Sequence, residues 1–165
     1  MIDLDITELF EEIVKELPEG LEILYPNGKG GTKVVKSPRL NYIFGSSQYI
    51  KDILDEYSKS SAQSERKFPL VALFTPISED RGDADYFSKA KVSLIIACSS
   101  CKEWSNEMRR TTSFKNILRP IYKRLLEVLY EDSRFDCDYD EKVKHSYSEN
   151  YSYGRYGAIQ IPVRL

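Results

Sequence analysis

Histidine and tryptophan are scarce in this chain, which has one of each among 165 residues, against 12 tyrosines. Histidine is the side chain that most readily exchanges protons near neutral pH, and it is the commonest metal ligand. One copy, His145, therefore excludes a multi-histidine metal site and argues against histidine-based catalysis. It lies outside any motif from which a Ser/His/Asp or Cys/His nucleophile could be built.

The chain also lacks long apolar runs, an apolar leader and an excess of positive charge. Its longest apolar runs, near 70–74 and 94–97, have the length of strands and fall far short of the ~20 residues of a membrane span. The N-terminal sequence MIDLDITELFEEIVKEL does not have the pattern of a signal peptide. With 24 basic and 26 acidic residues the net charge is −2, which argues against a dedicated nucleic-acid-binding protein. We expect a cytoplasmic chain that binds neither membranes nor specific nucleic-acid sequences.

The three cysteines are an odd number, which indicates reduced thiols in a cytoplasmic protein. Cys98 and Cys101 form a CxxC motif between an apolar strand and a predicted helix, which is the setting of a thioredoxin-like redox site. However, no tryptophan precedes the motif, and the surrounding order of elements is not that of thioredoxin. The alternative is that two small residues close a strand, with one or both of them buried.

Three other site patterns are incomplete. A zinc set of three cysteines and a histidine lacks ligand spacing in its second half. A row of alternating aspartates lacks the glycine and the final glutamate of a calcium loop. The glycine-rich segment 28–33 lacks the spacing of a phosphate loop, so a hairpin turn is predicted there. The residues concerned are Cys98, Cys101, Cys137 and His145 for zinc, and Asp136, Asp138 and Asp140 for calcium.

Apolar periodicity predicts the element order α-β-β-α-β-β-α-β. Helices are expected over 5–17, capped by Asp5, from Ser46 or Ser47 to about 57, and over about 103–130, where Pro120 predicts a bend or two pieces. Strand-like runs occupy parts of 21–36, 41–44, 68–74, 87–97 and the end of the chain. The runs 68–74 and 87–97 are joined by a polar loop and should pair antiparallel.

This pattern predicts an α+β fold, with a mostly antiparallel sheet packed against two or three helices. We expect a single domain over 1–165, whose segment 133–165 forms a Tyr-rich C-terminal strand or arm. Tyrosines in or near the helices should pack at the edge of the core; they are Tyr42, Tyr49, Tyr57, Tyr122 and Tyr130. One shared core is predicted for Leu70, Ala72, Leu94, Ile96, Ile117, Ile121 and Leu125.

Three groups of residues are candidates for a protein–protein interface. The Tyr-rich tail offers Tyr147, Tyr151, Tyr153 and Tyr156, since tyrosine buries area and still tolerates water. The predicted acidic loop offers Glu79 and Asp80, together with Asp83 and Asp85, which could instead bind a divalent ion or simply be solvated. The last helix offers a basic face that is either solvated or an intersubunit or phosphate-facing surface; its residues are Arg109, Arg110, Lys115, Arg119, Lys123 and Arg124.

Three short motifs follow one another in the segment 42–130. A Phe-Gly turn precedes a helix, a Lys-aromatic-Pro-aliphatic segment opens a strand, and an IL-x-P-I segment lies in an arginine-bearing helix. The matching segments are 44–45, 67–70 and 117–121. In this arrangement the chain resembles tail-terminator, or tail-completion, proteins of long-tailed bacteriophages and prophages. The resemblance covers about half of the chain and rests on structural residues.

The resemblance implies a small α+β protein that forms a ring, usually a hexamer, at the head-proximal end of the tail tube. Such a homo-oligomer contacts other tail or neck proteins and occurs in the host cytoplasm and in the virion. No catalytic residues are implied, so we expect neither an enzyme nor a cofactor or metal. Two alternatives remain open from the sequence: a thiol-disulfide oxidoreductase that uses Cys98 and Cys101, and a monomeric adaptor domain.

Overall fold

The computed structural model describes residues 5–27, 29–64, 66–81, 88–99, 103–134, 136–137 and 159–164. In chain order the elements are α1 (Ile6–Glu16), β1 (Glu22–Pro26), β2 (Thr32–Lys36), β3 (Asn41–Gly45), α2 (Ser47–Tyr57), α3 (Ser61–Ser64), β4 (Leu70–Arg81), β5 (Ser88–Ala97), α4 (Asn106–Arg109), η1 (Arg110–Leu118), α5 (Arg119–Glu131), β6 (Asp136–Cys137) and β7 (Ile159–Arg164). Element η1 is a π-helix that continues α4 and leads directly into α5.

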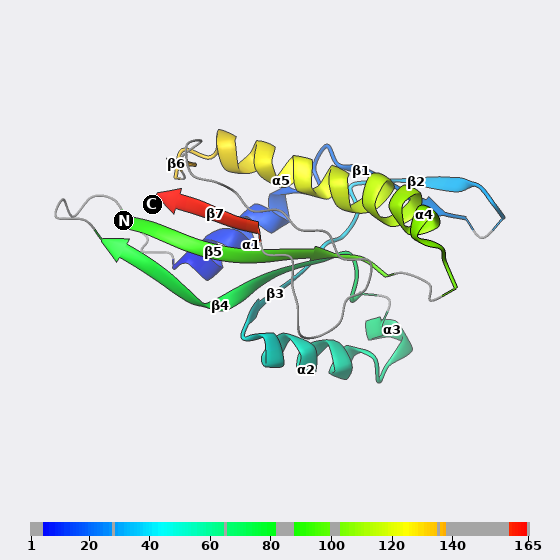
Figure 1. Ribbon diagram of the computed structural model, residues 1–165, viewed down its shortest axis with the longest axis horizontal. Coiled ribbons are helices and arrows are strands. Elements are labelled where there is room, and N and C mark those ends of the chain that lie inside the picture. Colours follow the sequence, from blue (N-terminus) through cyan, green and yellow to red (C-terminus); the bar gives the residue numbers. More distant parts are fainter. Residues whose placement is uncertain are drawn as a thin grey trace.

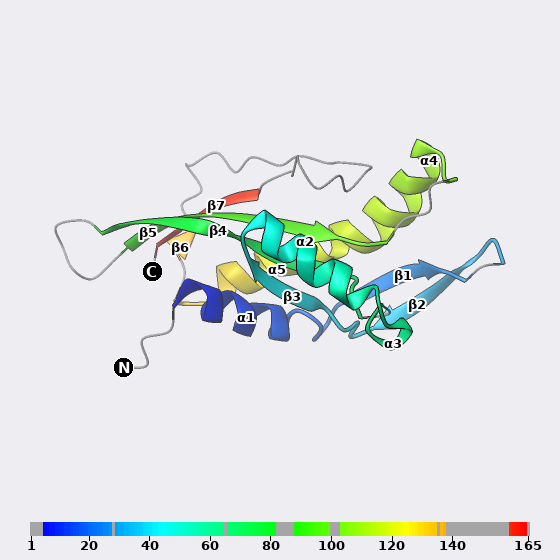
Figure 2. The same ribbon diagram turned by 90° about the horizontal axis from the view of Figure 1, so that it is seen from below.

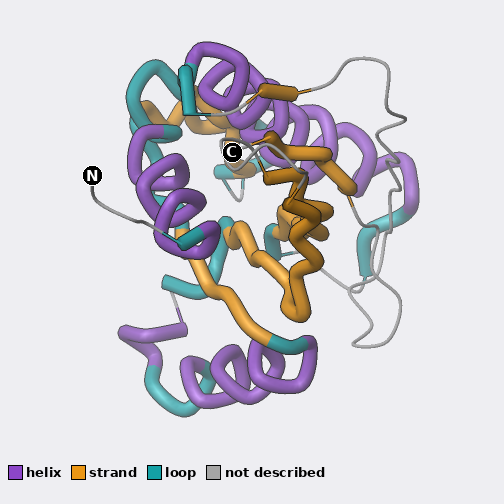
Figure 3. Tube along the Cα trace, turned by 90° about the vertical axis from the view of Figure 1, so that its left-hand side faces the viewer, coloured by secondary structure: helices purple, strands orange, loops and turns teal. Residues whose placement is uncertain are grey.

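The strands form one five-stranded sheet and one separate hairpin (Figure 1). The order in the large sheet is β3-β4-β5-β7-β6, and only the β3–β4 pair is parallel. Strands β1 and β2 form the hairpin, which projects from one end of the molecule (Figure 2). Helices α1 and α5 cover one face of the sheet, and α2 lies on the other face (Figure 3). The α+β class and the mostly antiparallel sheet are as predicted.

The prediction of one shared core is wrong, because β4 separates two cores. Successive side chains of a strand point to opposite faces. Val71 and Leu73 therefore pack with α1 and α5, whereas Leu70 and Ala72 pack with α2. The other members of the predicted set lie on the α1/α5 side, where Leu94, Ile117, Ile121 and Leu125 are buried and Ile96 is partly buried.

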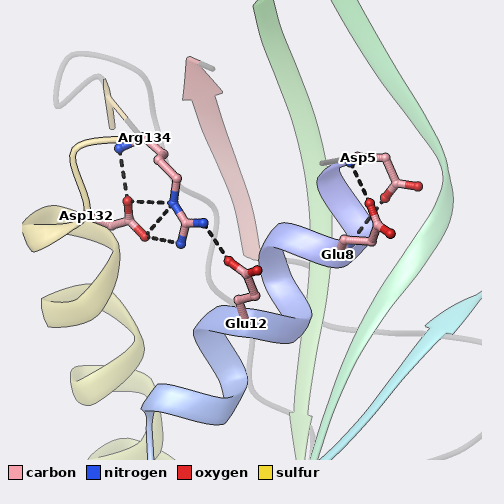
Figure 4. A network of polar contacts seen from close by, with 5 residues as sticks. All are labelled: Asp5, Glu8, Glu12, Asp132 and Arg134. Atoms are coloured by element: carbon pink, nitrogen blue, oxygen red, sulfur yellow. Dashed lines mark hydrogen bonds and ion pairs between the residues drawn. The ribbon is translucent and has the colours of Figure 1, made fainter. Parts of the chain in front are cut away.

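Helix α1 begins at the predicted cap. The Asp5 carboxylate accepts hydrogen bonds from the N–H groups of Thr7 and Glu8, and the Glu8 carboxylate accepts one from the N–H of Asp5, which completes a capping box (Figure 4). The hydrogen bond from the Thr7 hydroxyl is the largest of the causes that lower the Asp5 pKa. The cap thereby fixes where α1 starts.

An ion-pair network ties α1 to the end of α5 (Figure 4). Two nitrogens of the Arg134 guanidinium donate to the Asp132 carboxylate, and its Nη1 lies 2.6 Å from Glu12 Oε2. The hydrogen bond from Arg134 lowers the pKa of Asp132, and the same carboxylates raise the pKa of Arg134. The network therefore joins the two helices that cover the larger core.

The predicted helix over about 103–130 is one continuous run whose middle is widened into a π-helix. The N–H of Arg119 donates to the carbonyl of Phe114, which is a hydrogen bond of the π type, and Pro120 follows in the first turn of α5. Proline has no N–H, so it fits where the hydrogen-bond pattern changes. The expected break at Pro120 is thus a change of helix type.

Candidate assembly surface

The hairpin has one face toward the larger core, with Ile23 and Val35, and one outer face. Strand β1 packs against η1, and its Ile23 is fully buried, whereas the main neighbour of β2 is β1. On the outer face Leu24 pairs with Val34, whose side chain is 51% exposed. An isolated two-stranded hairpin is marginally stable in water, so its packing against the body of the protein, through Ile23, Tyr25 and Val35, supports it.

The hydrogen-bond pattern shows which backbone groups of β2 are unused by the hairpin. The N–H of Ser37 donates to the carbonyl of Leu21 at 2.9 Å, which identifies this pair as hydrogen-bonded. Hydrogen-bonded and non-hydrogen-bonded pairs alternate in an antiparallel ladder. Counting in twos from Ser37, Val35 is a bonded position, and the N–H of Val34 points away from β1.

Strand β3 is an edge of a different kind. It is the outermost strand of the large sheet, and it carries two aromatic residues, Tyr42 and Phe44. The N–H of Asn41 donates to the carbonyl of Pro69, so it points toward β4. The backbone groups of Tyr42 and Phe44, which alternate with it, therefore point to the outer edge. No other described strand pairs with that edge. The Phe44 side chain is 46% exposed, and its ring lies 6.2 Å from that of Tyr42.

The turn from β3 into α2 holds a second exposed aromatic residue. Gly45 has φ +146°, and a Cβ there would lie 2.6 Å from Cδ1 of Tyr49. Glycine thus lets the Tyr49 ring lie against the turn, while the Ser46 hydroxyl caps α2 by accepting from the N–H of Tyr49. Tyr49 is nevertheless 52% exposed, so the prediction that it packs at the core edge is wrong, as it is for the 46% exposed Tyr130.

The two edges lie in opposite electrostatic surroundings. Strand β2 has two lysines, Lys33 and Lys36, and no carboxylate. Both helices that contact β3 are acidic: α1 has four glutamates against one lysine, and α2 has three carboxylates against one lysine. Lys36 Nζ lies 3.7 Å from Glu22 Oε1, but both side chains are largely exposed, so the attraction between the two charges is weak.

The two half-buried tyrosines near these edges are structural. Burial raises the pKa of Tyr25 to about 12, with a further contribution from nearby Cys98. Burial also raises the pKa of Tyr42, whose hydroxyl donates to the carbonyl of Thr7 at 2.9 Å. Both phenols therefore stay protonated near neutral pH, and Tyr42 fastens β3 to the start of α1.

The structure does not provide the setting that the redox hypothesis requires at Cys98. Burial raises the pKa of its thiol, and a smaller opposite effect comes from the nearby Ser113 hydroxyl, which is buried and forms no well-aligned hydrogen bond among the described residues. Reactive thiols have a lowered pKa. In addition, α4 begins only at Asn106, with Ser105 as its N-cap, so Cys98 does not open a helix. Cys101 lies outside the described residues.

The structure describes only some of the residues predicted for interfaces. Glu79 and Asp80 were expected in a loop, but they belong to β4, which continues to Arg81 because it pairs with β5 along this stretch. Arg110 forms an ion pair with Glu107 one turn earlier, and Arg109 is half-buried on α4. Outside the described residues lie Tyr147, Tyr151, Tyr153, Tyr156, Asp83 and Asp85.

Within the described ranges, no group of three or more histidine, cysteine, aspartate or glutamate side chains is arranged to hold a metal ion. The zinc and calcium motifs fall largely outside these ranges, which include neither His145 nor Asp138 and Asp140. The helices that are described are all too short or too polar to cross a membrane.

Sequence reasoning missed the two strand edges and their exposed side chains, Val34, Phe44 and Tyr49. The segments TKVVK and NYIFG have β-type composition, which predicts strands but gives no information on which strand ends a sheet. That property depends on the order of strands, which only the structure provides.

Comparison with known proteins identifies no relative: no family model matches the chain, and neither the curated proteins nor the solved structures include a significant match.

Proposed function

We propose that this chain is a structural, self-assembling protein of the tail-terminator or tail-completion type. In this proposal several copies close into a ring at the head-proximal end of a phage tail tube and contact neighbouring tail or neck proteins. The observation that carries the proposal is that exposed apolar side chains lie at two separate places, Val34 on the hairpin and Phe44 with Tyr49 at the β3–α2 corner. Unlike patches on one subunit suit a heterologous interface, which is the kind that closes rings.

The three motifs of the resemblance support this proposal because each has a structural role. Gly45 makes room for Tyr49 at the β3–α2 turn. The carbonyl of Pro69 accepts a hydrogen bond from Asn41 where β3 and β4 begin to pair. Pro120 follows the change from π-helix to α-helix. Residues that shape a scaffold, with no chemistry of their own, are what an assembly subunit needs.

The thiol-disulfide oxidoreductase is the weaker candidate, since the partly buried Cys98 thiol has a raised pKa and does not open a helix. An insulin-disulfide reduction assay separates the two functions. We expect no reductase activity in the wild-type protein, and we expect Cys98→Ser to assemble as the wild type does. Reductase activity that Cys98→Ser abolishes would contradict the proposal.

The proposal is tested by light scattering and negative-stain imaging of the purified chain from micromolar to near-millimolar concentration. We expect a discrete oligomer of uniform mass that appears as closed rings. A chain that stays monomeric over the whole range, or grows into filaments of unlimited length, contradicts the ring.

A further inference from the structure

We infer that copies of this chain join by strand addition, with β2 of one copy lying along the outer edge of β3 of the next. The inference rests on the proposed self-assembly and deepens it by naming the two surfaces that meet. Each strand has five residues, and neither pairs on its outer side with another described strand. Extended strands commonly bind to exposed sheet edges in this way.

The backbone groups required for such pairing are already oriented. The N–H of Val34 points away from β1, and the backbone groups of Tyr42 and Phe44 point away from β4. Natural edge strands are usually protected by lysine, proline or a bulge, because such edges otherwise bind another strand. The sequence of β3, NYIFG, contains no charged residue and no proline. Among the described residues no strand pairs with this short edge, and β3 itself has no lysine or proline to protect it.

The side chains of the two strands also fit each other. On β3, Phe44 faces the α1 side of the sheet and Ile43 faces α2. If Val34 is placed on the Phe44 side, alternation along β2 puts Lys33 on the side of α2, together with Val35, which packs partly against the core of its own copy. An exposed apolar residue then meets an exposed ring, and a lysine faces the acidic helix.

Charge complementarity identifies a second copy of the chain as the partner. Strand β2 carries two lysines and no carboxylate, and β3 lies between two acidic helices. The net charge of the whole chain is only −2, so the segregation of charge between the two edges exceeds what the overall composition requires. Opposite potentials on two contact patches favour correct encounter and disfavour like-with-like pairing.

The geometry prevents the two edges of one copy from meeting each other. The hairpin projects outward from the end at which β3 begins, whereas the β3–α2 corner lies at the other end of β3 (Figures 1 and 2). The contact therefore has to form between copies. Because the edges differ, each copy keeps one unused edge after pairing, and assembly continues until the ring closes.

Two variants block one edge each. Val34→Pro removes the outward N–H and leaves the bonded positions of the β1–β2 ladder intact, and Val34→Thr is its control because it keeps the N–H and the β-branched shape. Phe44→Lys places a charge on the β3 edge, and Met108→Lys is its control because Met108 is a similarly exposed apolar residue, 48% exposed, on α4 and not on either strand. Thermal melting verifies that each variant is folded.

Native mass spectrometry then measures the variants alone and mixed. We expect Val34→Pro and Phe44→Lys each to be monomeric alone and to form one-to-one heterodimers when mixed, since each supplies the edge that the other has lost. We expect both controls to assemble as the wild type does. If the wild type assembles and the two edge variants, measured alone, assemble as well, the strand-addition contact is overturned but the ring is not. A wild type that never assembles overturns both.

A charge-exchange pair provides a second, independent readout. Lys33→Glu should raise the protein concentration needed for assembly at least tenfold, and so should Asp52→Lys on α2. The double variant carries both exchanged charges at every interface and should recover most of the wild-type affinity. If the double variant assembles no better than expected from the two single variants acting independently, Lys33 does not lie near Asp52 across the interface.

Discussion

The two faces of the five-stranded sheet are packed very differently. Among the described residues, eighteen buried side chains lie on the face covered by α1 and α5, and six lie on the face covered by α2. Burial of apolar area is the main source of stability, so the first face accounts for most of the free energy of unfolding. Of the two exposed aromatic residues at the β3–α2 corner, Tyr49 belongs to α2 on the second face, whereas Phe44 lies at the sheet edge and faces the α1 side. In the proposed assembly, stability depends mainly on the first face, and contact between copies depends on residues at the sheet edge and on the hairpin.

The largest effect is expected from the densely packed face. Leu94 is fully buried there, and Leu94→Ala should lower the free energy of unfolding by ~2–5 kcal/mol. Urea denaturation measures the loss, and Lys91→Ala, which changes an exposed residue of the same strand, should stay within ~0.5 kcal/mol. A loss near zero for Leu94→Ala would show that β5 is placed incorrectly in the sheet.

The sparsely packed face should respond less, and locally. Leu54 of α2 is 2% exposed, but it packs in the smaller cluster, so we expect Leu54→Ala to lower the free energy of unfolding by ~2 kcal/mol, at the low end for such truncations. Amide exchange should accelerate mainly in α2. A loss larger than that of Leu94→Ala would reverse the ranking of the two faces.

The ion-pair network of Glu12, Asp132 and Arg134 joins the two helices that cover the first face, and its contribution to stability can be measured. Asp132→Asn should lower the free energy of unfolding at pH 7 by ~1 kcal/mol, because it weakens the paired contact with Arg134. The pKa of Asp132 is depressed in the folded state, so its contribution is present above the ordinary value of 3.8 and is lost as the pH falls through the folded value.

Urea denaturation of the wild type and Asp132→Asn at several pH values measures this dependence. The difference between the two proteins should shrink as the solution is acidified below pH 4. Glu107→Gln serves as the control, because its pair with Arg110 is exposed and should contribute under ~0.5 kcal/mol. A difference that does not change with pH would show that Asp132 acts through packing and not through charge.

The smallest effect on stability is expected at the hairpin. Val34→Thr changes a side chain that is 51% exposed, so the free energy of unfolding should change by less than ~0.5 kcal/mol. Thermal and urea denaturation at a concentration below assembly measure it. A large loss would mean that Val34 supports the fold of a single copy, and the contrast between edge and core would fail.

The sequence predicted helices and strands better than it predicted which side chains pack together. The structure confirms the predicted α1 cap at Asp5 and the antiparallel β4–β5 pair, and of the two serines predicted as the α2 cap it selects Ser46. The segment 70–73 is apolar at every position, so it indicates burial on both faces but not which side chain faces which helix. The two cores therefore could not be separated by periodicity alone.

The candidate site was predicted less well than the fold, for a related reason. Whether a strand lies at the edge of a sheet depends on residues far away in sequence. The residues around Phe44 and Val34 therefore do not indicate that either lies on an edge strand. The CxxC motif was the most conspicuous local signal, and its Cys98 is partly buried, which raises the pKa of the thiol. A short motif reports residue spacing, whereas reactivity depends on the surrounding structure.

The most direct test of edge-to-edge assembly is residue-resolved hydrogen exchange in the assembled protein, with Val34→Pro as the monomeric reference. The account predicts that the amides of Tyr42 and Phe44 exchange at least tenfold more slowly in the assembly than in the monomer. The amide of Ile43, which alternation directs toward β4, should be protected in both. Equal exchange of the Tyr42 and Phe44 amides in assembly and monomer would contradict the account.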